Sequence, residues 1–292
     1  MRHTRAARVR HAARTWPREV PAGESSDAPA RQPVWLFDLD NTLHHASHAI
    51  FPQINRLMTA YMARVLGTDE ATASQVRVDY WRRYGATLLG LVRHHGVDPA
   101  DFLAHAHTFD DLRAMVRAER GLAQLLRALP GRKILLTNAP VAYAREVLRL
   151  IGLKRAFMRE IAVEHMWVHR RLRPKPDPLM LRRLLARERI APSRAILVED
   201  TLSHLKRYRR LGIRTVWVTG YLRKVATTAA PGAQPTSAAD ALHPMQATAM
   251  GARANSPHRP AATPILFANR PGYVSVKVKS VLQLKRRLVR RG

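Results

Sequence analysis

The sequence predicts an α/β protein whose mostly parallel sheet carries helices on both faces and whose first strand is followed by a helical insert. Three observations support this prediction. Val34–Phe37 is a continuous apolar run, short enough for a strand that is buried on both faces. Residues 45–120 show helical patterning and no convincing strand. From Lys133 onward, short apolar runs alternate with amphipathic segments, which is typical of a parallel sheet covered by helices.

The segment before the first strand is expected to lack a fold of its own. Residues 1–33 are rich in arginine, and their second half contains four prolines together with Gly, Ser and Ala. The first 20 residues lack the apolar core of a secretory signal. We therefore predict a basic, disordered N-terminal arm over 1–33, with order beginning at Val34.

Within the helical insert, residues 51–66 form the clearest element. Apolar side chains recur there at the i, i+3, i+4, i+7 spacing of an amphipathic helix, and Gly67 is a plausible stop. Asp98 and Pro99 have the residue types favoured at the N-cap and first position of a further helix. We expect 45–120 to be a separate helical unit inserted into a core made of 34–44 and 121–224.

The rest of the core is predicted as alternating elements. They are a strand at 133–138, a helix at 141–151, a short strand at 160–163, a helix at 178–189, a strand at 195–199, a helix at 202–211 and a strand at 213–219. Residues 225–266 are dominated by Ala, Thr and Pro and are predicted to be a disordered insert. Residues 267–292 are expected to complete the core with an edge strand at 273–278 and a basic helix at 281–288.

The net charge of +29 first indicates a nucleic-acid binder. More than half of that charge, however, lies outside residues 34–221, and 42 of the 50 basic residues are arginine, a skew that GC-rich coding alone would produce. Nucleic acid is therefore not expected as the partner.

The absence of cysteine excludes a disulfide scaffold, a thiolate zinc site and a cysteine nucleophile. No apolar run approaches the ~18 residues of a membrane span, and we expect a cytoplasmic protein without a membrane partner.

Chemically active side chains follow several of the predicted strands. Because ligands of parallel sheets bind beyond the carboxyl ends of the strands, these side chains define a candidate site. They are Asp38, Asp40 and Thr42 after the first strand, Thr137 and Asn138 after the second, Glu199 and Asp200 at the end of the strand at 195–199, and Lys175 in a proline-rich loop. Clustered carboxylates need a cation, and hard oxygen ligands suit Mg²⁺. Such a cation beside a lysine and a threonine hydroxyl favours a phosphate group as ligand.

Four of these segments resemble the motifs of the haloacid dehalogenase superfamily of phosphatases. Phe37–Leu43 (Phe-Asp-Leu-Asp-Asn-Thr-Leu) resembles the first motif, Leu136–Asn138 the second, Lys175 the third and Glu199–Thr201 the fourth, in the family's order. The resemblance implies a doubly wound, Rossmann-like core with a helical cap inserted after the first strand. It also implies a phosphatase or phosphomutase, because dehalogenase members lack an acid at the position of Asp40.

The resemblance also implies a role for each residue. Asp38 would be the nucleophile, and Asp40 the general acid and base. Thr137, the backbone around Asn138 and Lys175 would bind the phosphate. The Mg²⁺ ligands would be Asp38, the backbone carbonyl of Asp40, Asp200 and Glu199, with Glu199 acting directly or through water. Thr42 would support the loop.

A finer resemblance is to pyrimidine 5′-nucleotidase-like members. It rests on Asp38–His44, on Leu136–Ala139 and on the start of the insert near Ile50–Pro52. It implies hydrolysis of a pyrimidine nucleoside 5′-monophosphate. Phosphoglycolate-type or sugar-phosphate phosphatases and phosphomutases of the same superfamily remain alternatives, as does a basic nucleic-acid-binding protein with a retired core. The oligomeric state stays open.

Several histidines need a separate interpretation. The family often has an asparagine shortly after its fourth motif, where this chain has Ser203-His204, so that loop is expected to have weaker support. His44, His45 and His48 do not have the spacing of a metal site. We expect these three to lie at the cap entrance, in contact with substrate or solvent.

Overall fold

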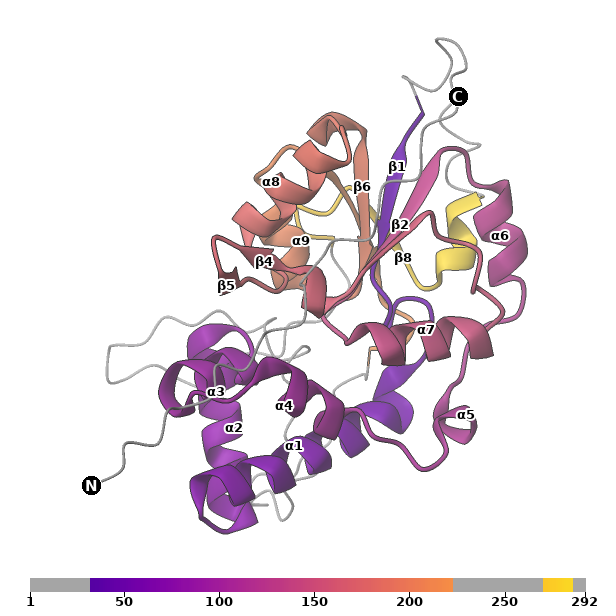
Figure 1. Cartoon of the computed structure of the whole chain (residues 1–292). Helices are drawn as coiled ribbons and strands as arrows, with labels where there is room; N and C mark the ends of the chain where they lie inside the picture. Colours follow the sequence, from indigo (N-terminus) through magenta and orange to yellow (C-terminus); the bar gives the residue numbers. More distant parts are fainter. Residues whose placement is uncertain (1–31, 223–269, 286–292) are drawn as a thin grey trace, which may run out of the picture.

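A six-stranded parallel sheet, in the order β3-β2-β1-β6-β7-β8, forms the centre of the protein (Figure 1). The computed structural model describes residues 32–222 and 270–285. Its strands are β1 (Val34–Phe37), β2 (Arg132–Leu136), β3 (Arg159–Ile161), β6 (Ala195–Glu199), β7 (Arg214–Val218) and β8 (Val276–Val278). The chain builds outward from the central β1 in both directions, as a doubly wound sheet does, so the predicted fold class is confirmed.

The apolar run of β1 explains why this strand is central. All four of its side chains are buried, and they alternate between the two faces of the sheet. Val34 and Leu36 belong to one hydrophobic cluster, and Trp35 and Phe37 belong to the other. The indole Nε1 of Trp35 donates to the carbonyl oxygen of Pro130 at 2.8 Å, which satisfies its buried polar atom.

Helices cover both faces of the sheet. On one face, α6 (Leu122–Ala128) and α7 (Val141–Leu150) bury leucine and valine side chains against the Trp35 side of β1. On the other, α8 (Pro178–Arg187) and α9 (Leu202–Arg209) pack against the side that carries Val34 and Leu36. This arrangement leaves the carboxyl edge of the strands as the open side of the core.

A helical cap is inserted between β1 and β2 and lies at that carboxyl edge (Figure 1). Its helices are α1 (Ile50–Leu66), α2 (Glu70–Tyr84), α3 (Thr87–His95), α4 (Pro99–Ala106) and α5 (Leu112–Met115), followed by α6 against the sheet. The predicted stop of α1 is confirmed, because Gly67 adopts the left-handed conformation there with a φ of 61°. The side chain of Asp98 caps α4 by accepting from the backbone N–H of Ala100, as its residue type predicts.

One pair of strands was not predicted from the sequence. The antiparallel hairpin of β4 (Trp167–Val168) and β5 (Arg171–Leu172) has only two residues in each strand, too few for an alternating pattern. Its turn residues His169 and Arg170 both have positive φ angles, of 50° and 61°. Glycine or asparagine usually marks such a turn, so the ordinary sequence signal is missing.

At the C-terminal side, β8 pairs in parallel with β7, within the range predicted for an edge strand. A 3₁₀ turn at Val281–Gln283 begins where a basic helix was predicted. Residues 286–288 of that helix lie outside the described residues, as do 1–31 of the arm and all of the 225–266 insert. Within the described ranges, no helix is both long and apolar enough to cross a membrane.

Candidate active site

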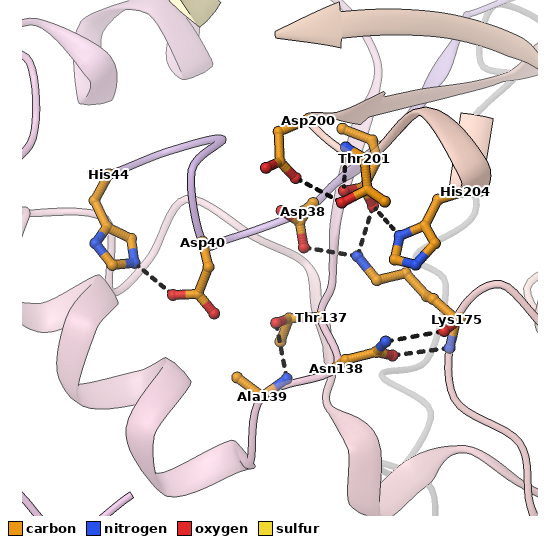
Figure 2. Close-up of polar contacts among 11 residues, drawn as sticks. Asp38, Asp40, His44, Thr137, Asn138, Ala139, Lys175, Asp200, Thr201 and His204 are labelled. Carbon is orange, nitrogen blue, oxygen red and sulfur yellow. Dashed lines mark hydrogen bonds and ion pairs between the residues drawn. The ribbon is translucent and has the colours of Figure 1, made fainter. Parts of the chain in front are cut away.

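The predicted site residues meet at the carboxyl edge of the sheet (Figure 2). β1 lies between β2 and β6, so the segments that follow these three strands are neighbours in space although they are far apart in the chain. Asp38 and Asp40 come from the end of β1, and Thr137 and Asn138 from the end of β2. Glu199 and Asp200 come from the end of β6, and Lys175 reaches in from the loop before α8.

Hydrogen bonds within the loop after β1 stabilise its conformation. Asn41 adopts a positive φ of 58°, a conformation that asparagine tolerates better than most residues. Its side-chain amide donates to the Oγ of Ser47 at 2.8 Å and accepts from the backbone N–H of Ser47 at 3.0 Å. The backbone N–H of Leu43 donates to the carbonyl oxygen of Leu39 at 2.8 Å, and Thr42 is buried within this turn. These contacts hold Asp38 and Asp40 on the site side of the loop.

Lys175 joins two of the carboxylates. Its Nζ donates to Oδ1 of Asp38 at 2.6 Å and to Oε2 of Glu199 at 2.8 Å, and the side chain is buried. Asn138 fixes the backbone that carries this lysine, because its amide exchanges two hydrogen bonds with the main chain of Lys175, at 2.8 and 3.0 Å. The side chain of Asn138 is therefore occupied, and its backbone is the part that can face a ligand.

Three carboxylates form a compact acidic cluster. Asp38, Glu199 and Asp200 are buried, and each offers an oxygen within 4.8 Å of the others. Burial and the charge of Glu199 raise the pKa of Asp38 to about 7 and raise the pKa of Asp200 well above its usual value. Oδ2 of Asp38 is buried without a hydrogen-bond partner. A cation would satisfy this oxygen and relieve the repulsion, so the cluster fits a divalent metal that prefers oxygen ligands.

Glu199 is surrounded by hydrogen-bond donors. Besides Lys175, the Nδ1 of His204 lies 3.0 Å from Oε2, and the backbone N–H of Thr201 donates to Oε1 at 3.1 Å. Although burial alone would raise it, Lys175 and His204 hold the pKa of Glu199 well below its usual value. The position where the sequence indicated a missing asparagine therefore carries a histidine on α9 that supports the fourth motif.

We expect His204→Ala to destabilise the protein. The substitution removes a hydrogen bond to a buried carboxylate and leaves a cavity, which costs about 2 kcal/mol of unfolding free energy. Urea denaturation followed by circular dichroism would measure this loss. His48→Ala, which changes an exposed histidine, is the matched control and should leave stability nearly unchanged. A His204→Ala protein as stable as the wild type would contradict the supporting role.

Asp40 has its own set of partners, which the sequence analysis did not anticipate. Its Oδ1 accepts a hydrogen bond from the phenol of Tyr143 at 2.7 Å and lies 2.8 Å from Nε2 of His44. His44 is therefore buried against Asp40, whereas His48 is exposed and His45 stacks on Tyr221. The i, i+4 spacing of Asp40 and His44 could have indicated their contact from the sequence. Tyr143 lies 103 positions away and had no such signal.

Thr137 completes the phosphate-binding set proposed from the sequence. Its hydroxyl accepts from the backbone N–H of Ala139 at 3.1 Å, which fixes the turn between β2 and α7. Figure 2 shows Thr137 next to Asn138 at the end of β2, below Asp38 in this view. The structure thus brings together all the residues named from the four motifs.

Residues 34–206 match the family of haloacid dehalogenase-like hydrolases. The match spans more than half of the chain and includes every residue of the clusters around Lys175 and Asp40. The protein is thus a hydrolase built on a capped α/β core. It belongs to the haloacid dehalogenase-like family, which confirms the superfamily that the four motifs indicated.

Individual relatives have low sequence identity to this chain. Phosphate metabolism protein 8 of Saccharomyces cerevisiae is 27% identical over 139 residues, which are 44% of this chain and 42% of the yeast protein. The matched part thus spans less than half the length of that curated relative. A HAD phosphatase from Thermococcus onnurineus has a TM-score of 0.51 at 14% identity, covering 88% of this chain and 97% of that one. An L-2-haloacid dehalogenase from Xanthobacter autotrophicus has a TM-score of 0.48 at 16% identity, covering 89% and 99%.

Proposed function

We propose that this hydrolase is a Mg²⁺-dependent phosphatase that cleaves a small phosphomonoester through an aspartyl-phosphate intermediate on Asp38. The observation that carries the proposal is the position of Asp38. Lys175 holds one of its carboxylate oxygens, and the other is buried without a partner among acidic neighbours. A carboxylate placed in this way can act as a nucleophile once positive charge offsets its repulsion from a phosphate dianion.

The reaction divides between the two aspartates. An oxygen of Asp38 attacks phosphorus, and the bond from phosphorus to the ester oxygen breaks. Asp40 donates a proton to that leaving oxygen, then takes a proton from the water that attacks the phosphorus and frees Asp38. Thr137, the backbone of Asn138 and Lys175 hold the phosphate oxygens during both steps.

The proposed ligands of Mg²⁺ are Asp38, the backbone carbonyl of Asp40, Asp200 and Glu199, the last directly or through water. The bound cation supplies positive charge that lowers the repulsion between Asp38 and the phosphate. An acid at position 40 also supports phosphate chemistry over dehalogenation, because an alkoxide needs a proton on departure and a halide does not.

For the substrate we propose a pyrimidine nucleoside 5′-monophosphate. Support comes from the likeness of Asp38–His44 and Leu136–Ala139 to pyrimidine 5′-nucleotidase-like members. The excess of basic residues that remains over 34–221 also favours an anionic substrate.

A substrate panel tests this proposal. The purified protein should release phosphate from UMP and CMP with Mg²⁺, and EDTA should stop the release. Purine monophosphates, phosphoglycolate and a sugar phosphate belong in the same panel. Preference for one of the last two would move the assignment to the alternative phosphatases, and no turnover of any compound with Mg²⁺ would overturn the proposed function.

A further inference from the structure

The proposed general acid, Asp40, is held asymmetrically. Both of its partners contact the same oxygen, because Oδ1 accepts from Tyr143 at 2.7 Å and faces Nε2 of His44 at 2.8 Å. Figure 2 shows one carboxylate oxygen of Asp40 bound to His44 and the other pointing away from it. A carboxylate oxygen has two lone pairs, so two donors use the capacity of Oδ1 and leave Oδ2 for other partners.

The two donors are themselves held firmly. His44 is fully buried in the loop that carries Asp40. Tyr143 lies in the first turn of α7 and is also buried, so its phenol reaches Asp40 from a different element than the loop that carries His44. Donors on separate elements prevent the carboxylate from rotating freely about its last bond.

The cap contributes to this arrangement. His107 and Phe109 follow α4, and both pack against the ring of Tyr143, with centroid distances of 5.3 and 5.7 Å. They also contact each other, at 6.5 Å. Tyr143 is thus placed between the cap and Asp40, and the cap segment at 107–109 restrains the ring whose hydroxyl holds the carboxylate.

We propose that Tyr143 and His44 are positioning residues that fix Asp40 through Oδ1, so that Oδ2 is the oxygen that transfers protons, with His107 and Phe109 keeping Tyr143 in place. This proposal rests on the proposed function, because it assigns the oxygen through which Asp40 acts as acid and base. In the first step Oδ2 gives its proton to the ester oxygen as the phosphorus–oxygen bond breaks. In the second it takes a proton from the attacking water.

Loss of the contacts that position Asp40 should affect substrates differently, according to how strongly their leaving group needs a proton. A nucleoside 5′-monophosphate leaves as an alkoxide and depends on protonation by Asp40. p-Nitrophenyl phosphate leaves as a stabilised phenolate and depends on it far less. A loss of Asp40 positioning should therefore slow the first substrate much more than the second. General damage to the site would slow both.

Tyr143→Phe is the decisive variant, because it removes only the hydroxyl and keeps the ring that His107 and Phe109 contact. We expect kcat/KM for UMP to fall about tenfold, kcat/KM for p-nitrophenyl phosphate to stay within about threefold, and KM for both to stay near the wild-type value. His44→Leu should give the same selective loss. The matched control is Tyr61→Phe, which removes the hydroxyl that a buried tyrosine of the cap donates to Asp101 at 2.7 Å. It should leave the ratio of kcat/KM for the two substrates unchanged.

Any of the following results would overturn the proposal. Equal losses on both substrates in Tyr143→Phe and His44→Leu would reduce these residues to structural supports and overturn the proposal. Unchanged activity in both variants would overturn it as well. Wild-type protein that releases no phosphate from these two compounds or from any other compound of the substrate panel would overturn the proposed function itself, and the assignment of Oδ2 with it.

Discussion

Asp38→Asn is expected to abolish phosphatase activity, lowering kcat by at least about a thousandfold, because an amide cannot form the acyl phosphate. The substitution changes one oxygen to nitrogen and keeps the size of the side chain. The amide oxygen can still accept from Nζ of Lys175, which lies 2.6 Å from Oδ1 in the wild type. The loss of activity should therefore occur without loss of the fold.

Stability measurements distinguish a loss of the nucleophile from a loss of the fold. Burial and the charge of Glu199 raise the pKa of Asp38 to about 7, so we expect the charge of this side chain to disfavour the folded state when no cation is bound. Without Mg²⁺, Asp38→Asn should then be at least as resistant to urea as the wild type. Asp79→Asn, which alters an exposed carboxylate paired at 3.9 Å with Arg82, is the control and should retain full activity. Activity near the wild-type rate in Asp38→Asn would show that the nucleophile is another group.

Lys175→Met should destabilise the protein and inactivate it together. The ammonium of Lys175 is buried and contacts two buried carboxylates, at 2.6 and 2.8 Å. Methionine fills a similar volume but leaves Asp38 and Glu199 without their shared cation. Removal of one partner from a buried ion pair costs about 3–5 kcal/mol, because the remaining charge is uncompensated.

Urea denaturation in EDTA measures this cost directly. The free energy of unfolding of Lys175→Met should lie about 3–5 kcal/mol below the wild-type value, and phosphate release should be lost. Lys154→Met removes an exposed lysine and should change neither quantity. If Lys175→Met unfolds at the wild-type urea concentration, the carboxylates do not depend on this lysine for their stability.

Much of the core could be predicted from the sequence because its signals are local. β1 and β6 are fully buried, so each appears as a continuous apolar run, and the residues that follow such strands must meet at one edge of a parallel sheet. That geometry placed Asp38 and Glu199 in one site, and Lys175 was added to it from its proline-rich loop and its resemblance to the third motif. Capping at Asp98 and the stop at Gly67 follow from single residue types in the same way.

What could not be predicted depends on packing between distant segments. The bond between Tyr143 and Asp40 requires the first turn of α7 to lie over the end of β1. Helical periodicity predicts the buried face of α7 but not which distant residue that face contacts. His107 reaches Tyr143 only because the cap docks on the core. His204 was misjudged for a related reason, since its contact with Glu199 depends on how α9 leaves the strand end.

The most direct measurement is chemical trapping of the phosphorylated enzyme. Asp40→Asn should slow hydrolysis of the intermediate, since the base that activates water is lost. This variant is incubated with Mg²⁺ and p-nitrophenyl phosphate labelled in its phosphate, because the phenolate can leave without a proton from Asp40. The reaction is quenched in acid, the protein is digested, and the labelled peptide is identified by mass spectrometry. The label is expected on Asp38, bound as a hydroxylamine-sensitive acyl phosphate. Label on any other residue, or phosphate release with Asp38 unlabelled, would contradict the mechanism.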